Sequence, residues 1–166
     1  MVGCWYTDSR KTNIINLFDI KRWYIYEHKL VGSLGELKVI KACLKQEISV
    51  FTPFGDGNVV DLVLIVNGKC LKAQVKSTET GEDGVMYFKT KSEKSTRQQD
   101  PAHYYTEDEI DIFLLYSFIY DEVYVLPVKD APKSGFMLRR DNPKRKLKTM
   151  HFAKDYLFEE KIYTVV

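Results

Sequence analysis

Cysteine is scarce in this sequence, and long apolar runs are missing. The 166 residues include three cysteines, Cys4, Cys43 and Cys70, which is an odd number without the paired spacing of a metal site. This usage indicates free thiols in a reducing compartment, so we expect a cytoplasmic, intracellular protein. No apolar stretch approaches the roughly 20 residues that span a membrane, and the first residues lack the charged-then-apolar order of a signal peptide. We therefore expect no membrane partner.

An excess of one charge is also missing. The 25 lysines and arginines nearly balance the 23 aspartates and glutamates, so the net charge of +2 does not by itself indicate a partner. There is no glycine-rich phosphate-binding loop and no internal repeat, and His28, His103 and His151 lack the spacing of metal ligands. What is present is an ordinary globular composition, 45% hydrophobic and 29% charged, over about one domain's length.

We expect a single domain over residues 1–166. Its parts are an N-terminal extension at 1–27, a core at 28–130 and a basic C-terminal segment at 131–166. Apolar residues between 30 and 46 recur at helical spacing and predict an amphipathic helix. They are Leu34, Leu37, Ile40 and Leu44. The other expected elements are a strand at 48–54, a surface loop or frayed hairpin at 79–102, two strands within 111–128 and a short helix at about 151–160.

The most informative part of the sequence is a predicted hairpin. The runs "VVDLVLIV" and "KCLKAQVK" are joined by Asn-Gly at 67–68, the strongest short signal for a two-residue hairpin turn. With that turn, Asp61 lies opposite Gln74, and side chains alternate between the two faces. The core face then carries Val60, Leu62, Leu64, Val66, Leu71, Ala73 and Val75, with Lys69 at the turn. The other face carries Asp61, Val63, Ile65, Cys70, Lys72, Gln74 and Lys76.

This register brings a carboxylate, an amide and an ammonium to one patch. Opposed Cβ atoms lie about 5 Å apart, and Lys76 is diagonal to Asp61. Mg²⁺ prefers oxygen ligands, which Asp61, the Gln74 side chain and the Val75 backbone carbonyl can supply. A neighbouring lysine can orient a water molecule and offset the charge that builds on a phosphate. The pattern therefore indicates a metal-dependent site for phosphodiester hydrolysis.

A simpler interpretation of the same pattern is a cross-strand ion pair on a solvated face. Such pairs between a lysine and an aspartate are common and contribute little to stability. Val63 and Ile65 argue against it, because they make this face partly apolar and favour its being covered. Both interpretations stay open from the residues alone.

The order of motifs resembles the PD-(D/E)XK nuclease superfamily. The chain shows "GE" at 35–36 in the helix, a "PFGD" turn at 53–56, then "VVDLVL", the hairpin and "AQVKST". The arrangement is most similar to small bacterial homing endonucleases of group I introns, and next to archaeal Holliday-junction resolvases. The resemblance implies an α/β fold with a restriction-endonuclease-like core, in which helices flank a mixed, mainly antiparallel sheet of four or five strands. It also implies a Mg²⁺-dependent DNA endonuclease, with Mn²⁺ as a possible substitute, in a homing or junction-resolving role.

The resemblance also assigns roles to four residues. Asp61 matches the metal-binding aspartate, Gln74 occupies the D/E position, and Lys76 matches the lysine of the motif. Glu36 matches the helical glutamate that completes the metal shell in many members. Gln74 departs from the family pattern, since a neutral amide gives a cation less charge than a carboxylate does. An alternative for Glu36 is a capping box with Ser33, if the helix begins there.

Basic residues cluster in two segments that we expect to contact DNA phosphates. They are Lys89, Lys91, Lys94 and Arg97 in one segment, and Arg139, Arg140, Lys144, Arg145, Lys146 and Lys148 in the other. Because one site cuts one strand, cleavage of double-stranded DNA requires a homodimer or homotetramer. The rival hypotheses are a nucleic-acid-binding module that has lost catalysis through Gln74, and an interaction domain without DNA affinity.

Overall fold

The computed structural model describes residues 17–55, 58–92, 102–141 and 150–166. The chain divides into two units, Met1–Leu30 and Val31–Val166. The described part of the first unit is helical and belongs to α1 (Leu17–Lys45). The second unit contains the sheets and all other described helices. No helix among the described residues is long and apolar enough to span a bilayer.

The predicted hairpin is confirmed together with its register. Strands β2 (Leu62–Val66) and β3 (Lys69–Thr78) are antiparallel, and their ladder runs from the Val66–Lys69 pair to the Leu62–Ala73 pair. Asn67 and Gly68 form the turn with φ values of 51° and 77°. Both values are positive, as a type I′ turn requires, which explains why Asn-Gly fits here.

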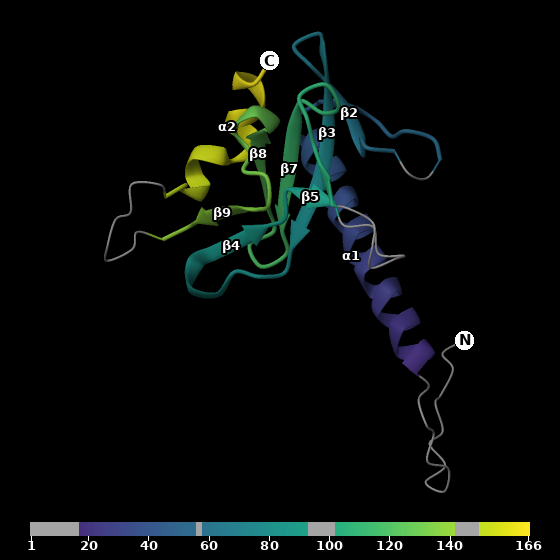
Figure 1. Ribbon diagram of the computed structural model, residues 1–166. Helices are drawn as coiled ribbons and strands as arrows, with labels where there is room; N and C mark the ends of the chain where they lie inside the picture. Colours follow the sequence, from purple (N-terminus) through teal and green to yellow (C-terminus); the bar gives the residue numbers. More distant parts are fainter. Residues whose placement is uncertain (1–16, 56–57, 93–101, 142–149) are drawn as a thin grey trace, which may run out of the picture. The chain divides into compact units, whose positions relative to one another are not determined.

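A five-stranded mixed sheet forms the centre of the second unit, as predicted (Figure 1). Its order is β1-β2-β3-β7-β8. The edge strands are β1 (Ser49–Phe51) and β8 (Glu122–Pro127), and β7 (Ile112–Ser117) lies between β3 and β8. β3 and β7 are parallel, and the other three pairs are antiparallel. The expected α/β fold with a mainly antiparallel sheet is therefore confirmed.

One face of this sheet packs against helices. Its buried residues include Leu62, Leu64, Val66, Leu71, Ala73, Val75, Ile112, Leu114, Tyr116, Val123 and Val125. Val39 and Cys43 of α1 and Phe158 of α2 (Phe158–Lys161) pack on this face. Six of the seven hairpin residues that we expected in the core, from Leu62 to Val75, lie here, and for them the predicted face is confirmed. The prediction is wrong for Val60, which precedes β2 and packs against the second core instead.

The helix at 30–46 is confirmed as part of α1, and Ile40 packs against the core as expected, but the other three predicted apolar residues do not. Leu34, Leu37 and Leu44 are 42%, 61% and 63% exposed, whereas Gly35, Val39 and Cys43 are buried. The reason is close packing at Gly35, where an added Cβ would lie 1.9 Å from Ser77 Oγ. Small residues let the helix backbone approach β3 closely, so the bulkier leucines point away from the sheet.

The other face of β7 and β8 is covered by a second small sheet that the sequence did not predict. It pairs β4 (Val85–Phe88) with β9 (Phe136–Arg139). Met86, Phe88, Phe136 and Leu138 are buried in a second core with Phe113, Leu115, Tyr124 and Leu126. The interpretation of 79–102 as a surface loop is therefore wrong for β4. β5 (Lys91–Ser92) pairs with β6 (His103–Tyr104), which lies just beyond the range expected for a frayed hairpin.

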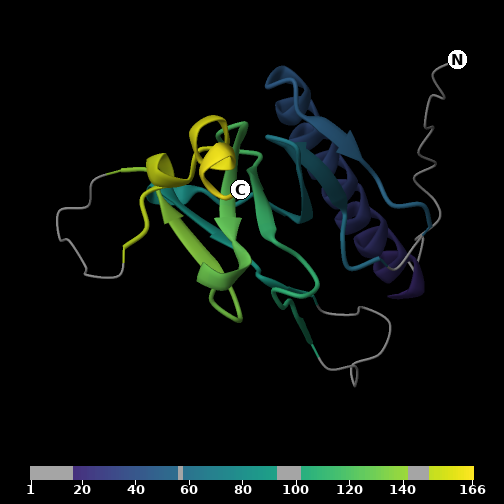
Figure 2. The same cartoon turned by 90° about the horizontal axis from the view of Figure 1, so that it is seen from above.

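Short helical turns complete the described chain. They are η1 (Glu82–Gly84), η2 (Val128–Asp130), η3 (Ala153–Tyr156) and η4 (Ile162–Thr164). Together with α2, η3 and η4 make up the helical C-terminal segment predicted at about 151–160, which lies beside β8 (Figures 1 and 2).

Candidate active site

Asp61 lies directly before β2 and is bound to the backbone of β3. Its N–H donates to the Ala73 carbonyl at 3.0 Å, and its Oδ2 accepts the Val75 N–H at 2.8 Å. The carboxylate thus satisfies a backbone donor of β3 beyond the last pair of the ladder. This double contact places the Asp61 side chain at the open end of the hairpin, opposite the Asn-Gly turn.

Gln74 faces Asp61, as the predicted register requires. Its Nε2 donates to Asp61 Oδ2 at 2.5 Å, and the residue is only 7% exposed. Its Oε1 is buried and has no hydrogen-bond partner among the described residues. An unsatisfied buried carbonyl oxygen is costly, so this atom is suited to a partner that supplies positive charge.

The Val75 carbonyl adds a further oxygen on the same side. The N–H and C=O of one strand residue point to the same side of the strand, and the Val75 N–H points at Asp61. The β2–β3 ladder ends at the Leu62–Ala73 pair, so β2 does not occupy this carbonyl. From this geometry we infer that the Val75 carbonyl also points to the Asp61 side of β3.

Glu36 extends from α1 toward the same group. Burial and the negative charge of Asp61 both raise the pKa of the Glu36 carboxyl. The second cause shows that the two carboxylates are close enough to repel each other. Because α1 begins at Leu17, Ser33 lies inside the helix, and the capping-box alternative is wrong.

The pKa of Asp61 is also raised, chiefly by burial. The Val75 N–H, the Lys76 charge and the Gln74 amide oppose that shift. Two half-buried carboxylates of raised pKa beside an unsatisfied amide oxygen form a set that fits a divalent cation, since a cation would neutralise the repulsion and satisfy the oxygen. No cluster of three or more His, Cys, Asp or Glu suited to a metal occurs in the described chain, so Gln74 and the Val75 carbonyl would have to complete this set.

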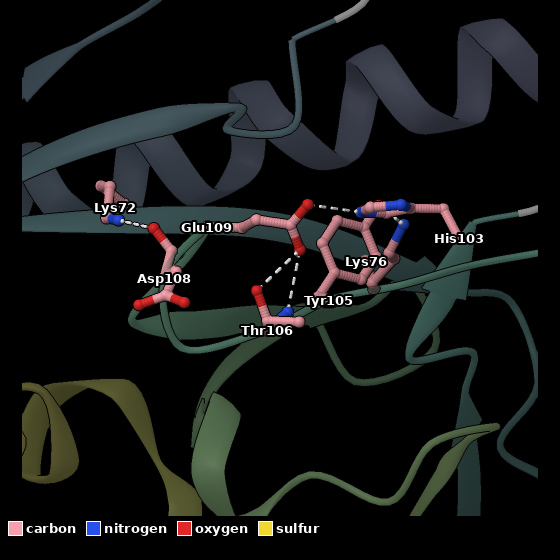
Figure 3. A network of polar contacts seen from close by, with 7 residues as sticks. All are labelled: Lys72, Lys76, His103, Tyr105, Thr106, Asp108 and Glu109. Carbon is pink, nitrogen blue, oxygen red and sulfur yellow. Dashed lines mark hydrogen bonds and ion pairs between the residues drawn. The ribbon is translucent and has the colours of Figure 1, made fainter.

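Lys76 lies at the edge of the group. Its Nζ donates to the Tyr105 hydroxyl at 3.0 Å, and its charge lowers the pKa of Asp61 (Figure 3). The lysine is thus near Asp61 but hydrogen-bonded to a neutral partner. With Gln74 buried, this arrangement disfavours the interpretation as a solvated cross-strand ion pair.

Sequence reasoning missed the place of Tyr105. The residue is separated from Lys76 by 29 positions, and the contact depends on how the 103–109 segment folds back over β7. Alternation along the hairpin says which face Lys76 occupies but not what covers it. Only a prediction of long-range contacts would have found this tyrosine.

The predicted DNA-contacting residues are only partly described. Arg140 contacts two residues next to and in β8, since its guanidinium lies 3.0 Å from a Glu122 oxygen and 4.4 Å from the centre of the Tyr120 ring. Arg139 belongs to β9. Lys91 is the first residue of β5, and Lys89 precedes this strand. Arg139 and Arg140 are therefore part of the folded second unit. Lys94, Arg97, Lys144, Arg145, Lys146 and Lys148 lie outside the described residues.

The mixed sheet, the hairpin that carries Asp61, Gln74 and Lys76, and Glu36 on α1 keep the order of motifs that resembles the PD-(D/E)XK class. The model of the PD-(D/E)XK endonuclease family matches residues 26–159, and the chain belongs to this family. Among solved structures, the fold is similar to that of the bacterial homing endonuclease I-Ssp6803I, with a TM-score of 0.68 and 24% sequence identity. That match covers 82% of this chain and 93% of the other. No curated protein sequence matches.

Proposed function

We propose that this protein is a Mg²⁺-dependent DNA endonuclease that hydrolyses phosphodiester bonds. The observation that carries the proposal is the buried, unpartnered Gln74 Oε1 beside the Asp61 carboxylate. If no ligand bound there, burial of this oxygen would only destabilise the folded state. The membership of this chain in a family of endonucleases supports DNA as the substrate.

Each residue of the group has a role in this proposal. Asp61, Gln74 Oε1, the Val75 carbonyl and Glu36 would hold Mg²⁺, with Mn²⁺ as a substitute. The cation would supply Lewis acidity and lower the pKa of a bound water. Lys76 would orient the attacking water and offset negative charge on the phosphate in the transition state. Asp61 would remain ionised beside the cation, despite the burial that raises its pKa.

The finer proposal concerns the form of the enzyme and its target. We infer that it acts on double-stranded DNA as a homodimer or homotetramer, because one chain offers one site. The exposed Leu34, Leu37 and Leu44 on α1 support a second copy, since large apolar side chains on one helix side favour association. The name of the fold neighbour supports a homing role, with junction resolution as the alternative.

Incubation with plasmid DNA tests the proposal. We expect conversion of supercoiled DNA to nicked or linear forms with Mg²⁺ or Mn²⁺, and none with a chelator. Binding of DNA without cleavage in either metal would favour the rival hypothesis of a binding module that lost catalysis through Gln74. Absence of both binding and cleavage would favour an interaction domain.

Salt dependence tests the basic segments. If Lys144, Arg145 and Lys146 contact phosphates, replacing each by glutamine should reduce the slope of log affinity against log salt by about 0.9 per contact. Arg140→Gln is the matched control, because Glu122 already pairs with this arginine and the slope should change less. Equal slopes for the wild type and the triple variant would contradict a phosphate contact.

A further inference from the structure

Tyr105 contacts the lysine of the candidate site from outside the hairpin. Its hydroxyl oxygen accepts from Lys76 Nζ at 3.0 Å, and the centre of its ring lies 4.9 Å from the same nitrogen (Figure 3). The hydroxyl is the nearer contact, so the hydrogen bond is the main interaction. The ring adds an electrostatic attraction for the ammonium.

The ring of Tyr105 is held by two edge-to-face contacts. Its centre lies 5.3 Å from that of Phe113 at an interplanar angle of 88°, and 5.0 Å from that of His103 at 86°. Phe113 is buried on β7 and pairs in register with Gln74 on β3. The tyrosine therefore rests on the strand beside the candidate site, and its hydroxyl reaches the next alternate residue of β3, Lys76.

The segment that carries Tyr105 is closed by a compact polar network (Figure 3). Glu109 Oε2 accepts the Thr106 N–H at 2.9 Å and its hydroxyl at 3.1 Å, while Glu109 Oε1 lies 3.1 Å from His103 Nε2. Lys72 Nζ donates to the Asp108 carbonyl and ties the turn to β3. These contacts lie on both sides of Tyr105 in the sequence and define the direction of its side chain.

We propose that Tyr105 is a positioning residue that holds the Lys76 ammonium at the Asp61–Gln74 site, a role that rests on the proposed nuclease function. Lysine has a flexible four-carbon stem, so its charge needs a fixed partner to stay in one place. A tyrosine hydroxyl is a neutral acceptor and leaves the positive charge of the ammonium uncompensated. The held ammonium can then offset the charge that builds on the phosphate in the transition state, which a lysine paired with a carboxylate would do less well.

Tyr105→Phe is the central test, because it removes the hydroxyl and keeps the ring contacts with Phe113 and His103. We expect the single-turnover cleavage rate constant to fall about tenfold, the loss of one hydrogen bond to a charged group. The dissociation constants for DNA and Mg²⁺ should stay within about twofold, since the lysine acts on the rate and not on binding. Tyr163→Phe is the matched control, because the Tyr163 hydroxyl donates to the Gln46 carbonyl at 3.4 Å, far in sequence from the proposed site.

The side-chain NMR signals of Lys76, assigned with Lys76→Met, provide a second readout that does not depend on activity. Tyr105→Phe should shift them, and Tyr163→Phe should not. If the signals do not move, the contact is overturned. If wild type cleaves and Tyr105→Phe cleaves at the same rate, the positioning role is overturned while the proposed function stands. If wild type fails to cleave with Mg²⁺ and Mn²⁺, the proposed function is overturned and this role with it. Equal losses of rate and of affinity would also overturn it, since they would indicate a general structural defect.

Discussion

Two aspartates, Asp61 and Asp111, are bound to opposite sides of β3 in the same way. Each precedes an apolar strand, and each donates its N–H to a β3 carbonyl, Asp61 to Ala73 at 3.0 Å and Asp111 to Lys72 at 2.8 Å. Each also accepts a β3 N–H with its side chain, Asp61 from Val75 at 2.8 Å and Asp111 from Lys72 at 2.6 Å. Local geometry therefore cannot distinguish the proposed metal ligand from a residue that only extends a strand pair.

The surroundings of the two aspartates separate them. Asp111 lies between the buried Ile110 and Ile112, and its carbonyl accepts the Val128 N–H at 3.0 Å. Asp61 instead has Glu36 and the unpartnered Gln74 Oε1 as neighbours. We conclude that a candidate site is recognised by the polar groups that the fold leaves unsatisfied, rather than by the carboxylate itself.

Replacing each aspartate by asparagine should separate the roles of Asp61 and Asp111 most clearly. Asp61→Asn keeps an acceptor for the Val75 N–H but removes the charge, so we expect cleavage to fall at least about 100-fold. Asp111→Asn should leave the cleavage rate nearly unchanged and lower the free energy of unfolding by about 1 kcal/mol. Plasmid cleavage and urea unfolding measure the two quantities. Similar losses of activity in both variants would refute the assignment of Asp61.

Substitutions at Gln74 test whether its side-chain oxygen is what distinguishes the surroundings of Asp61 from those of Asp111. Gln74→Leu removes the oxygen at similar volume, and we expect it to lose metal binding and most cleavage. Gln74→Glu restores a carboxylate and should keep activity at a lower Mg²⁺ concentration. Calorimetric titration with Mg²⁺, together with the plasmid assay, measures both effects. Cleavage by Gln74→Leu at the wild-type rate would restrict the metal set to Asp61, Glu36 and the Val75 carbonyl.

The approach of α1 to β3 provides a third test, because it brings a second carboxylate to Asp61 only. Gly35→Ala introduces a Cβ at 1.9 Å from Ser77 Oγ and should lower the free energy of unfolding by roughly 1–3 kcal/mol. Displacement of Glu36 should also reduce cleavage about tenfold. Gly32→Ala is the matched control, since nothing lies within 4 Å of its added Cβ and helix propensity should make it neutral or stabilising. Equal effects of the two substitutions would contradict a close approach at Gly35.

The smallest expected effect is on stability as a function of pH. The pKa values of Asp61 and Glu36 are raised above 3.8 and 4.5, so the protonated forms are favoured in the folded state. Their contribution to the free energy of unfolding is therefore complete below those values and is lost as pH rises through the folded-state pKa values. In metal-free urea unfolding, the free energy of unfolding of Asp61→Asn should depend less on pH than that of the wild type. Adding Mg²⁺ should raise the stability of the wild-type protein at higher pH. If the free energy of unfolding of wild type and of Asp61→Asn changed identically with pH in the absence of metal, the raised pKa of Asp61 would be contradicted.

The sequence carried enough information for the hairpin and the residues on it. The Asn-Gly turn and the alternation of apolar residues determine the register, and the register determines that Asp61 faces Gln74. The buried side of α1 could not be predicted from apolar spacing, because the contact with β3 selects small residues at Gly35 and Cys43. The β4–β9 sheet was missed because its two strands lie in polar segments far apart in the sequence.

The two described cysteines differ sharply in chemical reactivity. Burial raises the pKa of the Cys43 thiol to about 12, whereas Cys70 is exposed on β3 close to the Asn-Gly turn. The thiolate is the form that attacks an alkylating reagent, so Cys43 is protected from alkylation and the exposed Cys70 is available to it. With Cys4, which lies outside the described residues, replaced by serine, a maleimide dye would label the chain at Cys70. The dye would be attached to the hairpin whose other end carries Asp61, so its fluorescence could report DNA binding there. This label leaves every residue of the proposed site unmodified.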